Sequence, residues 1–156
     1  MLAEVSKENN HYLATFKRDI SHQIEDVWGY LTENNKLKQW FPELTIEDLS
    51  TNGKITFDMQ DGTFKIMTIT DFKEKSILAF TWAEDHVNFE LLPKQGGCQL
   101  ILKETIFQLT DHTPKDLAGW HVCLDVILSL LDHKSIDRKE KWKELYTAYQ
   151  QLLITN

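Results

Sequence analysis

The strongest constraint on the fold is an alternation of apolar and polar residues across the middle of the chain, from Leu44 to Leu109. Short runs in this region repeat with a period of two, and turn-forming stretches at 60–62 and 93–97 separate them. A period of two is typical of strands that bury one face. Strands joined by short turns pair antiparallel, because parallel pairing needs a long crossover. The sequence therefore predicts an antiparallel meander with strands near 55–59, 64–72, 78–82, 87–91 and 98–109.

Two short helices are predicted between a first strand at 12–20 and this meander. Apolar residues within 24–31 recur at spacings of three and four, which indicates a helix with one buried face, and Ser21 is placed to cap it. The same spacing recurs at 37–41, after which Pro42 ends the run.

A long helix is predicted after the meander. Thr113 is a suitable capping residue, Pro114 fits the first turn, and Asp116 suits the positive end of the helix dipole. The apolar face continues to Leu131, and the opposite face is interpreted as exposed to solvent; it carries His121, Asp125, Ser129 and Asp132. A second amphipathic helix is predicted at 142–153.

Length and composition limit the class of protein. The 156 residues fit one domain, 1–156, in which 1–11 are expected to form a loose N-terminal segment. Hydrophobic residues make up 42% and charged residues 26%, which argues against disorder. We see no signal peptide or membrane-length apolar run, and Cys98 and Cys123 show no metal-binding spacing. These features predict a cytoplasmic protein with reduced thiols.

The charge and the motifs exclude several functions. A net charge of −7 disfavours nucleic acid and anionic membranes as partners. The six histidines are scattered, and no zinc-binding, nucleophile-elbow or phosphate-loop motif occurs, so we predict neither a metal nor a cofactor. His121, one turn before Asp125, is expected to form an exposed ion pair with it.

Glu104 is the weak candidate for a catalytic residue. It shares a face of the last strand with Leu102 and Ile106, so it would be a lone carboxyl among apolar side chains. If that face is buried, desolvation would raise its pKa and suit it to donate a hydrogen bond, act as a general acid or hold a cation. The alternative is that Glu104 reaches water near the end of the strand or pairs with a lysine.

Several segments resemble the START-like superfamily. Within it, the chain is similar to the homologues of the heat-shock-protein ATPase activator, which are grouped with polyketide cyclases. The segments that carry the resemblance are 24–32 with 37–41, 80–82, 87–91 with 97–100, and 119–124. These segments follow one another in the family's order, and the resemblance as a whole covers about residues 12–153, nearly all the chain.

The resemblance implies an α+β helix-grip fold, in which a curved antiparallel sheet wraps around a long C-terminal helix. It also implies a deep apolar cavity between the sheet and that helix, near Trp40, Trp82, Phe89 and Trp120. With their inward-pointing neighbours, the expected ligand-binding residues are Trp40, Phe57, Met59, Trp82, Phe89, Leu102, Glu104, Trp120 and Leu124. The alternative is that these side chains simply pack together as a core.

Three functions remain open. The leading hypothesis is that the cavity binds an apolar or amphipathic small molecule, with desolvation of the aromatic lining as the driving force. The second is a cyclase- or aromatase-like enzyme that uses Glu104 as its acid and base. The third is a module that interacts with a chaperone, as the family name implies. The oligomeric state and the ligand's identity do not follow from the residues.

Overall fold

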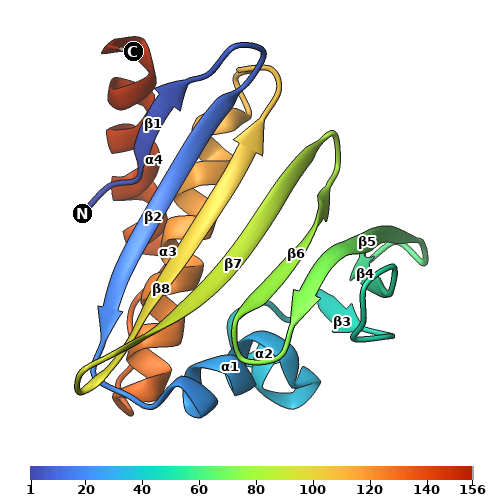
Figure 1. Cartoon of the computed structure of the whole chain (residues 1–156). Coiled ribbons are helices and arrows are strands. Elements are labelled where there is room, and N and C mark those ends of the chain that lie inside the picture. Colours follow the sequence, from blue (N-terminus) through green and yellow to red (C-terminus); the bar gives the residue numbers. More distant parts are fainter. Residues whose placement is uncertain (156) are drawn as a thin grey trace.

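The computed structural model describes residues 1–155 and contains an eight-stranded antiparallel sheet and four helices (Figure 1). Neighbouring strands follow the order β1-β2-β8-β7-β6-β5-β4-β3, so β3 to β8 form the predicted meander and β2 lies beside β8. The strands are β1 (Glu4–Lys7), β2 (Tyr12–Ile20), β3 (Leu44–Ile46), β4 (Lys54–Asp58), β5 (Phe64–Lys73), β6 (Ile77–Trp82), β7 (Asp85–Lys94) and β8 (Gly97–Ile106).

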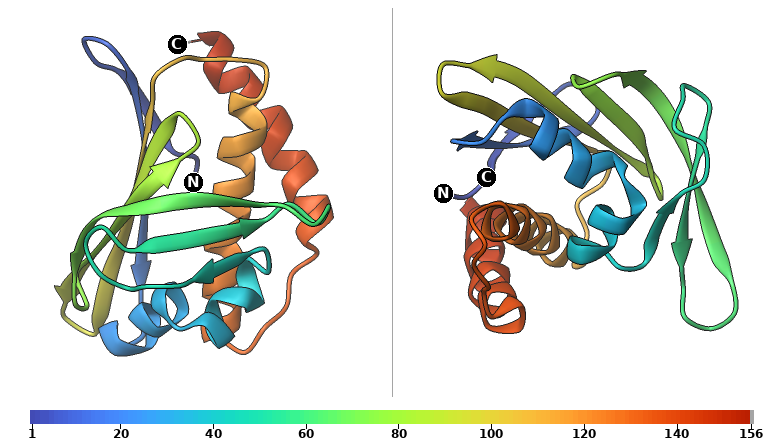
Figure 2. Two further views of the ribbon diagram at one scale, coloured as in Figure 1. Left: turned by 90° about the vertical axis from the view of Figure 1, so that its right-hand side faces the viewer. Right: turned by 90° about the horizontal axis from the view of Figure 1, so that it is seen from below.

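The sheet curls around one long helix, and a second long helix packs on the first from outside (Figure 2). The helices are α1 (Ile24–Thr32), α2 (Asn34–Trp40), α3 (Thr113–Leu131) and α4 (Arg138–Thr155). The gripped helix is α3, and the short α1 and α2 close one end of the curled sheet (Figure 1). This is the predicted helix-grip architecture. Among residues 1–155, no helix combines the length and apolar character needed to cross a membrane.

The curl of the sheet has a local cause in β5. The pairing register of β5 with β6 shifts between Ile69 and Asp71, whereas the first half of β5 pairs with β4 instead. Irregularities of this kind bend a strand and increase its twist. The bend carries β3, β4 and β5 across α3 (Figure 2).

The N-terminal segment 1–11 is not loose, and the prediction that it is loose was wrong. β1 pairs antiparallel with β2, with Val5 opposite Ala14. Just before β1, Ala3 is buried, and its backbone N–H donates a hydrogen bond of 2.9 Å to the Tyr149 hydroxyl on α4. Strand pairing and this link to the last helix together order the segment.

The face of α3 predicted to be exposed is largely buried, because α4 covers it. His121 is only 4% exposed, and Ser129 is also buried. The prediction that the pair of His121 and Asp125 is exposed to solvent was therefore wrong. The two side chains do approach each other, with 3.6 Å between Nε2 and Oδ2. Burial, with help from the Arg18 charge, lowers the pKa of His121 to about 4, so the ring is neutral at pH 7.

His121 belongs to a buried polar network that joins four elements. Arg18 on β2 lies 3.3 Å from Nε2, and Tyr149 on α4 lies 2.7 Å from Nδ1. A guanidinium group can only donate, so Nε2 accepts and the neutral ring carries its proton on Nδ1, which donates to the tyrosine oxygen. The same oxygen accepts the N–H of Ala3, ahead of β1. Each ring nitrogen therefore has a partner.

Two predicted helix caps and one strand end also differ from the structure. The N-cap of α1 is Gln23, not Ser21, and its side chain makes no capping bond. Thr113 is the first residue of α3, and its Oγ1 accepts the backbone N–H of Thr110. The last strand ends at Ile106 instead of residue 109, because the next N–H, that of Phe107, donates to a side chain and not to a strand.

Candidate functional site

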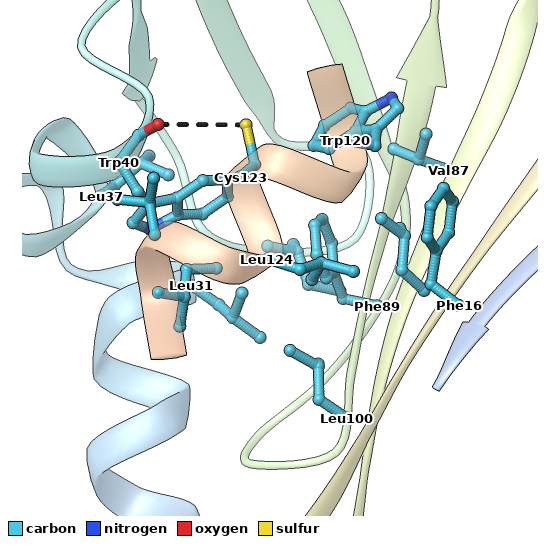
Figure 3. Packing of buried hydrophobic residues seen from close by; sticks show 14 of the residues in the cluster. Phe16, Leu31, Leu37, Trp40, Val87, Phe89, Leu100, Trp120, Cys123 and Leu124 are labelled. Atoms are coloured by element: carbon cyan, nitrogen blue, oxygen red, sulfur yellow. Dashed lines mark hydrogen bonds between the residues drawn. The ribbon is translucent and has the colours of Figure 1, made fainter. Parts of the chain in front are cut away.

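The space between the sheet and α3 is filled by the protein's own side chains, so the predicted deep cavity is absent from the described part of the chain. A void of about 10 Å³, at the lower limit for one water molecule, lies between the sheet and the short helices α1 and α2. Rings from three elements interdigitate between the sheet and α3: Phe89 lies 6.2 Å from Trp40 and 5.8 Å from Trp120 between ring centroids. Figure 3 shows Leu124 packed beside Phe89 and Trp120 beside Val87.

The structure places the expected ligand-binding residues in three different settings. Five of them are fully buried members of the core: Trp40, Phe89, Leu102, Trp120 and Leu124. Phe57 and Trp82 are half-buried at the mouth of the grip. Met59 is 39% exposed, just beyond the end of β4, and is not part of the core cluster. Glu104 is fully buried.

A groove at the mouth of the grip is lined by aromatic rings from separate elements. Trp82 on β6 is its centre, with ring centroids 5.0 Å from Trp120 on α3, 5.8 Å from Phe41 after α2 and 5.9 Å from Phe57 on β4. We call this feature the aromatic groove. Its volume is about 440 Å³, and its other lining residues are Glu43, His112, Lys115, Asp116, Gly119, Cys123, Arg138 and Trp142.

A second hollow adjoins the aromatic groove on the other side of Trp82. It lies between the β6–β7 turn and the segment that leads from β8 into α3, and its volume is about 580 Å³. We call it the acidic cleft; it is lined by Trp82, Ala83, Glu84, Asp85, Ile106, Phe107, Gln108, Thr110, His112, Thr113 and Asp116. Trp82, His112 and Asp116 line both hollows, so one ligand can contact the groove and the cleft together.

Hydrogen bonds fix the walls of the acidic cleft. The Trp82 indole N–H donates to Oδ1 of Asp116 at 3.0 Å, which links the β6 end to the first turn of α3. Asp85 Oδ1 accepts the backbone N–H of Phe107 at 3.0 Å, which links the β6–β7 turn to the end of β8. Each carboxylate is therefore positioned by at least one hydrogen bond.

Glu104 lies behind this cleft and does not reach water or pair with a lysine, so that alternative was wrong. On β8 it is paired with Val87 of β7 and Ala14 of β2, and its side chain is 0% exposed. Within the described residues, no donor reaches either carboxyl oxygen of Glu104, but the protonated group can donate a hydrogen bond to the Asp116 carboxylate. Burial raises the pKa of Glu104 well above its ordinary value, and the nearby carboxylates of Asp116 and Asp85 raise it further.

The remaining acids of the cleft also lack basic partners. Burial raises the pKa of Asp85, as do Asp116 and Glu84, while the bond from Phe107 opposes this effect. Across residues 1–155, none of these carboxyls forms an ion pair with a basic side chain. The same residues hold no cluster of three or more His, Cys or acidic side chains with metal-site geometry. The cleft is therefore an acidic, partly aromatic hollow.

Sequence reasoning missed most of this site. Asp116 was interpreted as a helix-start residue, and Asp85 and Phe107 were not singled out. The one local signal was Trp82 followed two residues later by the acidic pair Glu84–Asp85, an aromatic residue next to charge in a turn. Nothing in the spacing along the chain shows that this turn meets Glu104 and the start of α3.

Known structures share this architecture. The structure of EF2215 from Enterococcus faecalis, a protein of unknown function, is 30% identical, covers 98% of this chain and 91% of its own, and has a TM-score of 0.87. CalU16 from Micromonospora echinospora is 16% identical over 97% of this chain and 98% of its own, with a TM-score of 0.75. MLL2253 from Mesorhizobium loti is 19% identical over 80% of this chain and 99% of its own, with a TM-score of 0.69.

The sequence itself places the chain in a family. No curated protein matches it. The family described as activator of Hsp90 ATPase homolog 1-like protein matches residues 21–132, from just before α1 to just after α3. This match covers most of the chain and includes both walls of the acidic cleft. The chain therefore belongs to the activator of Hsp90 ATPase homolog 1-like family of the START-like superfamily.

Proposed function

We propose that the protein binds a small amphipathic molecule at the mouth of the grip, in the aromatic groove and the adjoining acidic cleft. The supporting observation is that the rings of Phe41, Phe57 and Trp120, from separate parts of the chain, meet around Trp82. Trp120 is buried, whereas Phe41, Phe57 and Trp82 are only partly buried. Ligand sites are typically apolar hollows of about 300–1,000 Å³ with a few oriented polar groups. At about 440 Å³, with Asp116 and Arg138 at its edge, the aromatic groove has these properties.

Gly119 supports the same interpretation. It lies in the middle of α3, where glycine costs helix stability, and it lines the aromatic groove. A Cβ atom built at this position meets no other atom within 4 Å. The absence of a side chain therefore leaves part of the groove floor open, and any larger side chain there would enter the space that a ligand needs.

The test uses 1-naphthylmethanol, a neutral amphipathic probe, and isothermal titration calorimetry. Trp82→Ala removes the central ring, and Gly119→Leu fills the floor; each is expected to weaken binding at least about tenfold, equivalent to about 1.4 kcal/mol. Phe64→Ala is the control, because Phe64 is an exposed ring on β5 outside both hollows. Equal affinity in all three variants, or no binding to the unmodified protein, would contradict the proposal.

The two other hypotheses have less support. A cyclase-like role for Glu104 requires contact with a substrate, yet its carboxyl is fully covered and does not line either hollow. A chaperone partner rests on the family's name, and fold or family likeness is a poor guide to function. A pull-down with the chaperone and an assay of its ATPase would test that role directly.

A further inference from the structure

A series of hydrogen bonds connects the interior of the grip to its mouth. Glu104 on β8 is fully buried, and no donor reaches either of its oxygens within residues 1–155. Its carboxyl lies beside that of Asp116, in the first turn of α3, and donates to it while it holds a proton. Asp116 in turn accepts the indole N–H of Trp82, on β6, at 3.0 Å. The three side chains therefore link β8, α3 and β6.

Trp82 is the side chain at the outer end of this series. Its ring is the centre of the aromatic groove and lines the acidic cleft as well. Contacts with neighbouring rings, such as Trp120 at 5.0 Å between centroids, fix how close the indole lies to the core. The polar edge of an indole also needs an acceptor, and Asp116 provides it. The orientation of Trp82, and with it the shape of both hollows, therefore depends on where Asp116 lies.

Asp116 is not held by a positive charge. Among residues 1–155 it forms no ion pair with a basic side chain. It is half-buried and lines the open cleft, so its carboxylate has room to turn toward solvent. Loss of the proton from Glu104 would remove a donor to Asp116 and place two negative carboxylates side by side.

We infer that Glu104 is a positioning residue for the proposed binding site, because its proton holds Asp116 and Asp116 orients Trp82 for the ligand. The inference rests on the proposed function and names its regulation by protonation. When Glu104 ionises, repulsion moves the Asp116 carboxylate toward the cleft, and the Trp82 indole loses its acceptor. The ring then turns, and the ligand binds more weakly.

The surroundings of Glu104 set the direction of the pH dependence. Burial raises its pKa well above the ordinary value, and the carboxyls of Asp116 on α3 and Asp85 on β7 raise it further. Its neighbours across the strands, Ala14 on β2 and Val87 on β7, are uncharged. The proton is therefore present at low pH and is lost as pH rises, so binding should weaken in that direction.

The first measurement needs no ligand. The ring C–H resonances of Trp82, assigned with Trp82→Phe, and the carboxyl carbon of Glu104 are followed by NMR from about pH 5 to about pH 9.5, a range above the ordinary pKa of a glutamate. The ring resonances are expected to shift with the same midpoint as the carboxyl. In Glu104→Gln they are expected to show no transition with that midpoint.

The second measurement is calorimetry with 1-naphthylmethanol, which has no charge over this range. The unmodified protein is expected to bind it at least about fivefold more weakly above the midpoint than below it, as the loss of one hydrogen bond implies. The amide of Glu104→Gln still donates to Asp116 but cannot ionise. This variant is therefore expected to bind equally well at both pH values. It retains Asp85 and His112, so their titration is common to both proteins.

Two further variants separate the proton from packing and from overall charge. Glu104→Met fills the same space without a donor, and it is expected to bind at least about threefold more weakly than Glu104→Gln at low pH. Glu74→Gln removes an acid from the exposed turn between β5 and β6. It is expected to keep the pH dependence of the unmodified protein.

The outcomes distinguish the two proposals. A Glu104 carboxyl that keeps its proton throughout the range, or a Trp82 ring that does not respond when the proton is lost, overturns the inference. The same pH dependence of binding in the unmodified protein and in Glu104→Gln overturns it as well, and the proposed function stands. If the probe binds none of the proteins, the proposed function is overturned, while the Trp82 resonances still show whether Glu104 positions the ring.

Discussion

Two buried polar groups differ in how their hydrogen bonds are completed. His121, between α3, α4 and β2, has a partner for each ring nitrogen. Glu104, between β8 and the start of α3, has only another acid, Asp116, to which it can donate while it is protonated. Both groups are less than 5% exposed and both have pKa values displaced toward the neutral form, so burial alone does not explain the difference.

The comparison indicates how a buried polar group depends on its partners. Tyr149 on α4 joins His121 to Ala3, just before β1, and Arg18 joins His121 to β2. The neighbours of Glu104, by contrast, are acids that line an open hollow. The His121 network is complete with a neutral ring, whereas the pairing of Glu104 with an acid depends on its keeping a proton.

The largest expected effect concerns pH and the His121 side. The pKa of His121 is about 4 in the folded protein against 6.5 ordinarily, so between these values only the unfolded chain binds the proton. The free energy of unfolding should therefore fall as pH falls from 6.5 to 4, by up to about 3 kcal/mol. Urea unfolding at pH 7 and pH 5 and an NMR titration of the ring measure this. A His121 ring that titrates near pH 6.5 would contradict this prediction.

The titration of Glu104 should change the free energy of unfolding in the opposite direction over the same pH range. Its folded pKa lies above its unfolded pKa, so the folded protein keeps a proton that the unfolded chain has lost, and stability falls as pH rises above about 4.5. Glu104→Gln removes this contribution and should make the loss of stability toward low pH steeper than in the unmodified protein. Parallel pH profiles for the two proteins would show that Glu104 titrates normally.

A smaller loss is expected when the His121 network is opened. Tyr149→Phe deletes the oxygen that accepts from Ala3 and His121, and it should lower the free energy of unfolding by about 1–3 kcal/mol. Tyr146→Phe is the matched control on α4, because the Tyr146 hydroxyl forms no hydrogen bond within residues 1–155. Equal unfolding midpoints in urea for the two variants would show that the network contributes little.

The smallest expected effect is a gain in stability, where Tyr149→Phe gives a loss. Glu104→Met replaces a buried carboxyl whose neighbours are two other acids with an apolar side chain of similar volume, and it should raise the free energy of unfolding by about 1 kcal/mol. The gain should be larger at pH 8 than at pH 5, because ionisation of the carboxyl costs more as pH rises. Urea titrations at both pH values measure it. A variant less stable than the unmodified protein at pH 8 would mean that Glu104 is well accommodated without a ligand.

The sequence predicted the architecture because residue periodicity reports which face of an element is buried. The meander, the two short helices and both long helices follow from spacing alone, and the family resemblance added the grip. β1 was missed because residues 4–7 have only one apolar side chain, and their pairing depends on Tyr149, far along the chain. The exposed face assigned to α3 was wrong because spacing does not show that α4 packs there.

The site was predictable only in part, because periodicity shows which way a side chain points but not how much space lies between side chains. It showed that Trp40, Phe89 and Trp120 point inward, yet it could not show that their rings meet and fill the space between them. It identified Glu104 as an unusual inward carboxyl. It could not place Asp85 and Asp116 beside it, because those neighbours are brought together by strand register and by the docking of α3.

The solid interior of the grip has a consequence for the binding proposed at its mouth. A ligand held there would enter and leave without opening the sheet, so its release would not wait for a slow opening motion. The acidic cleft is lined largely by a turn, residues 83–84, and a connecting segment, residues 107–112, both outside the hydrophobic core except Leu109. Substitutions in these two segments would change the proposed recognition while the folded scaffold keeps its stability.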